Sequence, residues 1–296
     1  MKKSIIAAGV LALLASTGAK AADIVTYQDQ AVAAPSGVNW TGFYVGGTIG
    51  GAWAESKTRL RGPMEISEGG DKDSWGRIAK KTVNPDSFIG GIYAGYNFEI
   101  GALANTPFLK DVVFGVETDF LFNSGNDRGG KDIDQEYVDF NSSANGRSWY
   151  LGEGADGARY KVRVKQKWNG ATRFRAGYAL GNEGRFMPYF ATGISYANIQ
   201  AKGAVLSYST ATGDRNYINE VGHHSMTKTR AGWNIGGGVD YVPPIMNDHL
   251  VLRAEYRFTD FGRDDYNVKD LNGNKKYNQV VKYYTNDFRV GVAYKF

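Results

Sequence analysis

Short segments of alternating side-chain character recur along this chain, and this period of two constrains the fold more than any other feature. In the stretch NWTGFYVGGTIGGAW, residues 39–53, apolar side chains and glycines occupy the odd positions from Phe43 to Trp53, whereas the even positions are largely small or polar. Successive residues of a β-strand point to opposite faces, so the stretch predicts a strand. Its glycines fit no nucleotide-binding loop, because neither the G-x-G-x-x-G nor the G-K-[ST] pattern occurs within residues 39–53.

The same alternation predicts eight strands. They comprise residues 43–53, 88–98, 112–122, 168–178, 190–196, 231–241, 250–258 and 288–296. Most are close to the roughly 10 residues that a tilted strand needs to cross a bilayer. Aromatic side chains stand at the ends of the apolar faces, as at membrane–water interfaces. The alternation alone fits the core of a soluble β-protein equally well.

The connections between these segments favour a membrane barrel. Long and short connections alternate strictly: residues 55–85, 123–159, 200–227 and 262–283 are long, and residues 101–110, 181–187 and 242–249 are short. Outer-membrane barrels have this asymmetry, and closure leaves no unpaired backbone in lipid. The sequence therefore predicts an all-β fold: an eight-stranded antiparallel up-and-down transmembrane β-barrel with four long extracellular loops and short periplasmic turns.

The N-terminus predicts export. Lys2 and Lys3 precede an apolar run, and the small-residue site Ala19-Lys20-Ala21 follows it. This is the layout of a signal peptide, so we expect a signal peptide at residues 1–21, a periplasmic leader at 22–39 and a barrel at 40–296 in the cell outer membrane. The leader could instead fold back as a plug or touch the cell wall.

Several segments resemble a known family. The runs WTGFYVGG, GGIYAGYNFE, VVFGVETDF, RFRAGYAL, TRAGWNIGGGVDY, RAEYRFTDFG and FRVGVAYKF are similar to those of the small outer-membrane β-barrel proteins of alphaproteobacteria, which include porin-like surface antigens and haemin-binding proteins. The resemblance implies the fold and the location, and it makes haemin the expected ligand. The terminal Phe296 resembles the signal that the barrel-assembly machinery recognises, which makes that machinery an expected partner.

The polar faces of the strands predict a charged cluster inside the barrel. Eight strands enclose a lumen that side chains can fill, and charges placed there need partners. The expected register puts Glu117 beside Arg175 and Asp119 beside Arg173. The predicted cluster comprises Glu117, Asp119, Arg173, Arg175, Arg253, Glu255, Arg257, Asp287 and Arg289. Two interpretations remain open, a salt-bridged plug, which we favour, and an ion pathway.

The third long connection holds the candidate haemin ligands. His223 and His224 are adjacent there, and Tyr217 lies nearby. Haem iron accepts imidazole or phenolate ligands. The alternative is an ordinary solvated loop, since no spacing motif supports the site. No metal-site motif is present, and no resident cofactor is expected.

A basic stripe precedes the fourth strand. Lys161, Arg163, Lys165 and Lys167 recur at period two. If the strand projects beyond the membrane, we expect them to line its inner or upper rim. There they could attract lipopolysaccharide, haemin propionates or host polyanions, or they could simply solubilise the strand.

Composition limits the remaining classes. Without Lys2, Lys3 and Lys20, 32 basic residues face 30 acidic ones, so no nucleic-acid partner is expected. The chain has no cysteine, and none of its three histidines falls on a predicted strand. We therefore predict no enzyme and no catalytic residue. The sequence favours a structural, ligand-binding surface protein over a porin-like channel, with an adhesin for host molecules or an enzyme as further alternatives.

Overall fold

The part of the chain that the structure describes begins at Gly37. The computed structural model describes residues 37–63, 65–66, 75–100, 109–125, 138–141, 143–144, 147–148, 157–181, 183–209, 216–269 and 275–296. The predicted signal peptide and residues 22–36 of the predicted leader lie outside these ranges.

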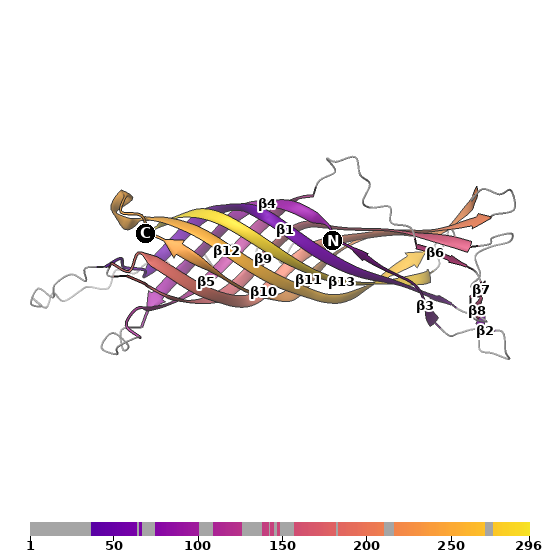
Figure 1. Cartoon of the computed structure of the whole chain (residues 1–296), viewed down its shortest axis with the longest axis horizontal. Helices are drawn as coiled ribbons and strands as arrows, with labels where there is room; N and C mark the ends of the chain where they lie inside the picture. Colours follow the sequence, from indigo (N-terminus) through magenta and orange to yellow (C-terminus); the bar gives the residue numbers. More distant parts are fainter. Residues whose placement is uncertain are drawn as a thin grey trace, which may run out of the picture. The chain divides into compact units, whose positions relative to one another are not determined.

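Eight long strands close into a ring (Figure 1). In ring order they are β1 (Gly42–Pro63), β4 (Asp86–Glu99), β5 (Val112–Gly125), β9 (Gly157–Tyr178), β10 (Phe186–Ser209), β11 (Asn216–Tyr241), β12 (Leu250–Lys269) and β13 (Lys275–Lys295). Every neighbouring pair is antiparallel, and β13 returns to β1. The eight predicted segments fall in these strands in order, which confirms the predicted fold class.

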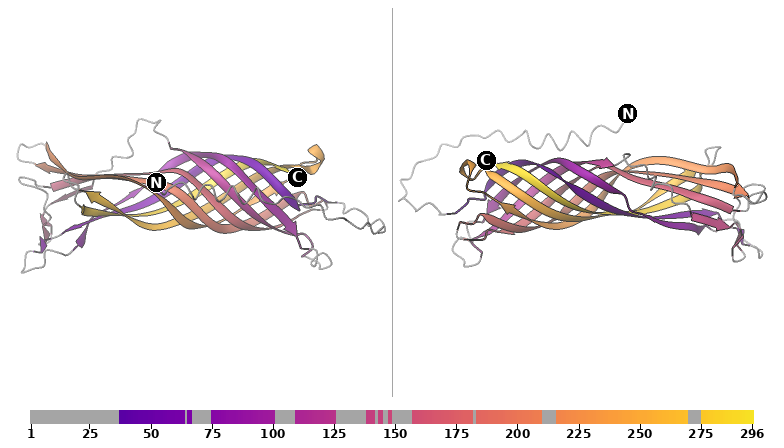
Figure 2. Two further views of the ribbon diagram at one scale, coloured as in Figure 1. Left: turned by 180° about the vertical axis from the view of Figure 1, so that it is seen from behind. Right: turned by 45° about the horizontal axis from the view of Figure 1, so that its top comes forward.

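Shorter elements lie beside the ring. Strand β3 (Trp75–Val83) pairs with β1, and β6 (Val138–Asn141) pairs with β9. A separate small sheet contains β2 (Glu65–Ile66), β7 (Ser143–Ala144) and β8 (Arg147–Ser148). Both views in Figure 2, like Figure 1, place these elements at the end of the barrel opposite the C-terminus.

The C-terminal end of the barrel carries the tight turns. The 3₁₀ turn η2 (Met246–Asp248) joins β11 to β12 just after Pro243 and Pro244, as the sequence predicts for a short turn. No helix in the described ranges is both long and apolar enough to cross a membrane.

The alternation divides each strand into an outer and an inner face. On β1, Phe43 and Ile49 are 59% and 56% exposed, whereas Tyr44 and Thr48 are 4% and 7% exposed. Large apolar side chains face outward on all eight strands of the ring. A soluble protein would bury these side chains, so their exposure fits a barrel that is surrounded by lipid.

Strand structure continues through much of what the sequence predicts as long loops. Strand β1 runs to Pro63, β9 already begins at Gly157, and β10 and β11 remain paired to Ser209 and Asn216. Outside the hydrocarbon layer an outward side chain meets water and need not be apolar, so the alternation fades while backbone pairing continues. Sequence patterning therefore underestimates the length of these strands.

Close approach of neighbouring strands explains the glycines of β1. A Cβ added at Gly50, on the inner face, would lie 2.1 Å from the Phe288 carbonyl oxygen and 2.9 Å from the Arg289 Cα. At Gly51, on the outer face, the nearest atom would be 4.0 Å away in the Trp53 ring. The narrow, strongly coiled ring thus excludes even a methyl group at Gly50.

The neighbouring glycines provide a matched test of this constraint. Gly50→Ala should destabilise the barrel by about 1–3 kcal/mol, because the added methyl group forces β1 and β13 apart. Gly51→Ala should leave stability nearly unchanged. Heat-modifiable electrophoretic mobility and urea unfolding of the refolded variants measure the difference; equal behaviour of the two variants would contradict the close-approach explanation.

Candidate functional site

Among the described residues, ten charged side chains meet inside the ring and form what we call the lumen cluster. Its members are Glu117, Asp119, Arg173, Arg175, Asp240, Arg253, Glu255, Arg257, Asp287 and Arg289, and none is more than 7% exposed. Five carboxylates thus face five guanidinium groups, so the cluster is neutral as a whole. The structure brings together all nine residues predicted for the lumen and adds Asp240.

Arg173 joins two carboxylates at the centre of the lumen cluster. Its Nη1 and Nη2 atoms lie 2.6 and 3.0 Å from the two carboxylate oxygens of Glu255, and Nη2 also donates to Glu117. Glu117 accepts further hydrogen bonds from Arg253 and, at 3.3 Å, from Arg175. Bidentate arginine–carboxylate pairs of this kind hold both side chains in a defined orientation and also neutralise their charges.

Aspartates extend the cluster to either side. Asp240 accepts from Arg175 at 2.5 Å and from Arg253 at 2.7 and 2.9 Å. On the other side, Arg257 lies 2.9 Å from Asp119 and 3.1 Å from Asp287. The charges therefore form one connected network across strands β5, β9, β11, β12 and β13.

The strand register differs from the expected one by two residues. Glu117 faces Arg173, and Arg175 faces Gly115. Both expected ion pairs nevertheless form, at 3.3 Å for Glu117–Arg175 and 3.6 Å for Asp119–Arg173. Arginine side chains are long enough to reach diagonal neighbours, so the contacts survive the shift in register.

Three tyrosines that sequence reasoning left out complete the cluster. Tyr44 donates to Glu117 at 2.7 Å, and Tyr189 donates to Glu255 at 2.6 Å. The Arg175 guanidinium lies 3.9 Å from the centre of the Tyr189 ring, and that of Arg253 lies 4.5 Å from the centre of the Tyr93 ring. Their positions on the inner face of the alternation are the signal that could have identified them.

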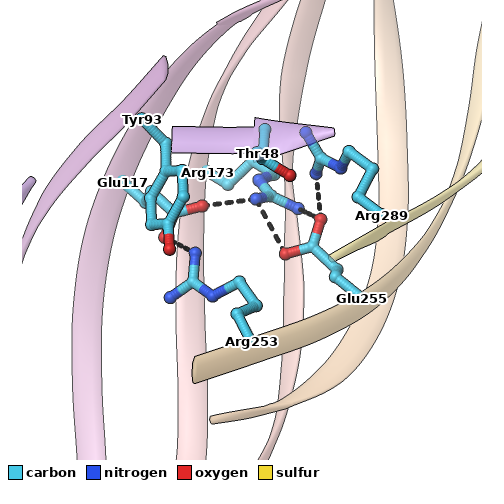
Figure 3. A pocket seen from close by; sticks show the side chains of 7 residues that line it. All are labelled: Thr48, Tyr93, Glu117, Arg173, Arg253, Glu255 and Arg289. Carbon is cyan, nitrogen blue, oxygen red and sulfur yellow. Dashed lines mark hydrogen bonds and ion pairs between the residues drawn. The ribbon is translucent and has the colours of Figure 1, made fainter. Parts of the chain in front are cut away.

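Little space remains within the lumen cluster. Figure 3 shows the cavity lined by Thr48, Tyr93, Glu117, Arg173, Arg253, Glu255 and Arg289, whose side chains point toward one another across the barrel. The cavity has room for about one water molecule.

Apolar side chains occupy the lumen on both sides of the charges. Ala52, Ile89 and Leu121 pack together on one side. At the C-terminal end the buried group comprises Val38, Trp40, Tyr44, Tyr93, Val113, Met187, Val242, Val251 and Ala293. The Trp40 indole donates to the Gly184 carbonyl oxygen at 2.8 Å, so the segment before β1 is fixed across this end of the barrel.

The predicted haemin ligands lie on a strand. His223, His224 and Tyr217 belong to β11, which replaces the predicted third long loop at these positions. Their side chains lie outside the described part of the structure. His249 follows η2, as predicted for a short turn, and its Nδ1–H donates a 2.6 Å hydrogen bond to the Lys295 carbonyl oxygen.

The basic stripe lies on the outer face of β9, which corrects the expected inner rim. Lys167 has no partner position in β10, because Asn198 faces Trp168 and the next residue, Ile199, faces Gln166. This extra residue exchanges the inner and outer positions of β9 on the far side of Lys167, so Gln166, between Lys165 and Lys167, points inward and is 5% exposed. Arg163 and Lys165 therefore face outward. The Lys161 side chain lies outside the described part of the structure.

The C-terminal residue closes the ring beside the first strand. The Phe296 backbone N–H donates to the Phe43 carbonyl oxygen at 2.8 Å, and the Phe296 ring is 69% exposed on the lipid side. Recognition of Phe296 by the assembly machinery stays a prediction.

Comparison with known proteins places the fold in context. The family model described as outer membrane protein beta-barrel domain matches residues 9–296. The 31 kDa outer-membrane immunogenic protein of Brucella melitensis is 30% identical, over 99% of this chain and 100% of that protein. The 25 kDa outer-membrane immunogenic protein of the same organism is 28% identical, over 99% and 98%. The outer membrane protein OprG of Pseudomonas aeruginosa has 12% identity and a TM-score of 0.40, over 88% of this chain and 98% of that one.

Removing one carboxylate charge should reveal how strongly the lumen cluster depends on neutrality. Glu117→Gln leaves five guanidinium groups against four carboxylates, and we expect it to lower the free energy of unfolding by about 3–5 kcal/mol. Glu55→Gln is the control, because Glu55 pairs with Lys57 at 3.0 Å on the solvent side and should change stability little. Urea unfolding in detergent measures both; a Glu117→Gln variant as stable as the control would contradict the argument.

Proposed function

The chain belongs to the outer membrane protein beta-barrel family, and on that premise we propose that its barrel is a sealed anchor for projecting strands that bind haemin at the cell surface. The single observation that carries the anchor role is the lumen cluster, in which ten charged side chains fill the space that a channel would need. The proposal assigns no chemical reaction to the chain.

The composition of the lumen supports a plug over an ion pathway. A pathway requires sites that an ion can enter and leave, with water between them. Here each carboxylate is already held by guanidinium groups, and the cavity among them has room for about one water molecule. An entering ion would have to separate buried pairs, which is costly in a low-dielectric interior.

The projecting strands have their own packed interior. Several side chains that lie beyond the lipid-facing segments of their strands are completely buried, namely Leu60, Ile199, Val281 and Tyr266. Burial also raises the pKa of Tyr277, in the same projection, to about 12. Such packing favours a stiff scaffold that can hold a ligand-binding group in a fixed place.

Backbone positions on this scaffold support haemin as the ligand. Tyr217 stands opposite Tyr208 in the β10–β11 pairing, and His223 stands opposite Lys269 in the β11–β12 pairing. Imidazole and phenolate are ligands that haem iron accepts, and a cation suits the propionates. Because successive strand positions belong to opposite faces, we expect either His223 or His224, but not both, to bind the haem iron.

A conductance measurement tests the sealed anchor. The refolded protein in a planar bilayer should give no steady current above that of the bare bilayer, since the lumen cluster blocks the path. A general porin inserted under the same conditions is the positive control. Stable, reproducible current steps from this protein would instead support the porin-like alternative.

A haemin titration tests the ligand. We expect a saturable, one-site shift of Soret absorbance that is lost in His223→Ala or in His224→Ala. The Tyr217→Phe variant shows whether a phenolate contributes. His249→Ala is the matched control, because His249 lies at the opposite end of the barrel and stacks on Tyr294 with ring centres 5.2 Å apart. An unchanged shift in all three candidate variants would exclude these ligands, and no saturable shift would contradict haemin binding.

A further inference from the structure

The backbone ladder between β11 and β12 is interrupted just beyond the lipid-facing part of the barrel. Trp233, which is 52% exposed on the outer face, stands opposite Asp260, and the next paired position is His223 with Lys269. Between these two positions the backbones of β11 and β12 are described without a break, yet they do not pair. The unpaired stretches, which we call the β11–β12 seam, are residues 224–232 and 261–268.

The seam separates two continuous sheets, which we call the leaves of the projection. One leaf contains β6, β9, β10 and β11, and the other contains β3, β1, β13 and β12. Within each leaf, backbone pairing joins every strand to the next. The ring joins the leaves at one end of the seam, and the pairing of His223 with Lys269 and of β2 with β8 joins them again beyond it.

A bulge in β12 lies at the start of the seam. Two residues of β12, Phe261 and Gly262, stand against the single residue Tyr283 of β13. Gly262 has a φ of +66°, a conformation that glycine adopts readily, and its N–H donates to the Asp260 carboxylate at 2.7 Å. A bulge bends the strand that carries it, which explains why β12 stops pairing with β11 at this point.

Arg230 of β11 reaches across the seam to the bulge. Its guanidinium group donates to the carbonyl oxygen of Phe261 at 2.8 Å and to that of Val281, in β13, at 3.4 Å. The Arg230 side chain is buried, so water does not compete freely for these bonds. A side chain thus supplies the contact between the leaves that the backbone ladder supplies elsewhere in the ring.

Lys228 makes a second contact of this kind farther along the seam. Its Nζ atom donates to the Asp265 carbonyl oxygen at 2.6 Å and lies 2.9 Å from the Asp264 carboxylate. It also lies 4.8 Å from the centre of the Tyr266 ring. About a third of the Lys228 side chain is exposed, so dissolved salt weakens its attraction to Asp264.

Two buried amides lie between the leaves. Gln279, on β13, is completely buried, and Gln166, on β9, is 5% exposed. Neither the amide nitrogen nor the amide oxygen of either side chain has a hydrogen-bond partner in the described part of the structure. Unpaired buried polar groups are rare because they are costly. A closed seam therefore leaves a cost that contact with water or a polar solute would remove.

We propose that the β11–β12 seam is a lateral gate in the projection, which Arg230 and Lys228 hold closed and which admits small polar molecules to the space between the leaves. Two side chains are easier to displace than a backbone ladder, so this is the line along which the wall opens most readily. The lumen cluster lies inside the ring and stays closed when the gate opens. The proposal does not depend on haemin binding.

Single introduced thiols test the gate, because the chain has no cysteine of its own. Ala201→Cys places a thiol between the leaves, and Ala171→Cys places one inside the ring; both alanines are completely buried. The full chain, refolded in uncharged detergent, is labelled with N-ethylmaleimide, and the rate is followed by mass spectrometry. Adding Arg230→Gln or Lys228→Gln should accelerate labelling of the Ala201→Cys protein on the order of tenfold and leave that of the Ala171→Cys protein unchanged.

Lys282→Gln is the matched control. Lys282 lies 3.6 Å from Asp260, but the two strands that carry this pair are also joined by their backbones, so its loss should not change labelling. In the absence of latch substitutions, high salt should accelerate labelling of the Ala201→Cys protein, since it weakens the contact of Lys228 with Asp264.

Three results would each overturn the gate. They are unchanged labelling in both latch variants, equal acceleration by Lys282→Gln, and equal acceleration of the Ala171→Cys protein, which would indicate loosening of the whole barrel. Heat-modifiable mobility verifies folding. If neither latch variant folds, the salt series decides, and a labelling rate that does not rise with salt would overturn the proposal.

Discussion

The requirement that every backbone N–H and C=O be paired within lipid governs this structure. A single ring of eight antiparallel strands satisfies it, because β13 returns to β1 and leaves no open edge. A ring of this size is narrow, so inner side chains approach the neighbouring backbone closely. Gly50 is an example of this close approach, because there is no room for a Cβ between it and the Phe288 backbone.

The narrow ring also determines what its interior can be. Polar side chains that alternate with lipid-facing ones must point into a space that their own volume fills. Charges confined there are stable only when paired, and the lumen cluster pairs five carboxylates with five guanidinium groups. Trp40 and its apolar neighbours cover one end of the cluster. A barrel filled in this way is suited to anchoring, which leaves binding to its outer surfaces.

Beyond the hydrocarbon layer the outer faces of the same strands can carry polar and charged side chains. Water can solvate an outer side chain there, so Lys165 and Lys202 occupy positions that would be too costly within lipid. The interior of the projection is packed as well, and Leu60 and Tyr266 are completely buried there. The projection is thus a second packed region built on the same strands, and the positions proposed for haemin binding belong to it.

The sequence by itself determined the number of strands in the ring, their order and which side of each membrane segment faces lipid, because lipid imposes an alternation that is visible in single segments such as Phe43–Trp53. It also indicated a charged lumen, since polar residues on the inner face have no other place to lie. The tertiary structure decided what depends on several strands at once. Three features depend on such contacts between strands: the two-residue shift that places Glu117 opposite Arg173, the inclusion of Asp240 in the lumen cluster, and the inward packing of Trp40. The outward direction of Lys165 depends on them too, because one extra residue at Lys167 reverses every side chain beyond it, and only pairing with β10 reveals that residue.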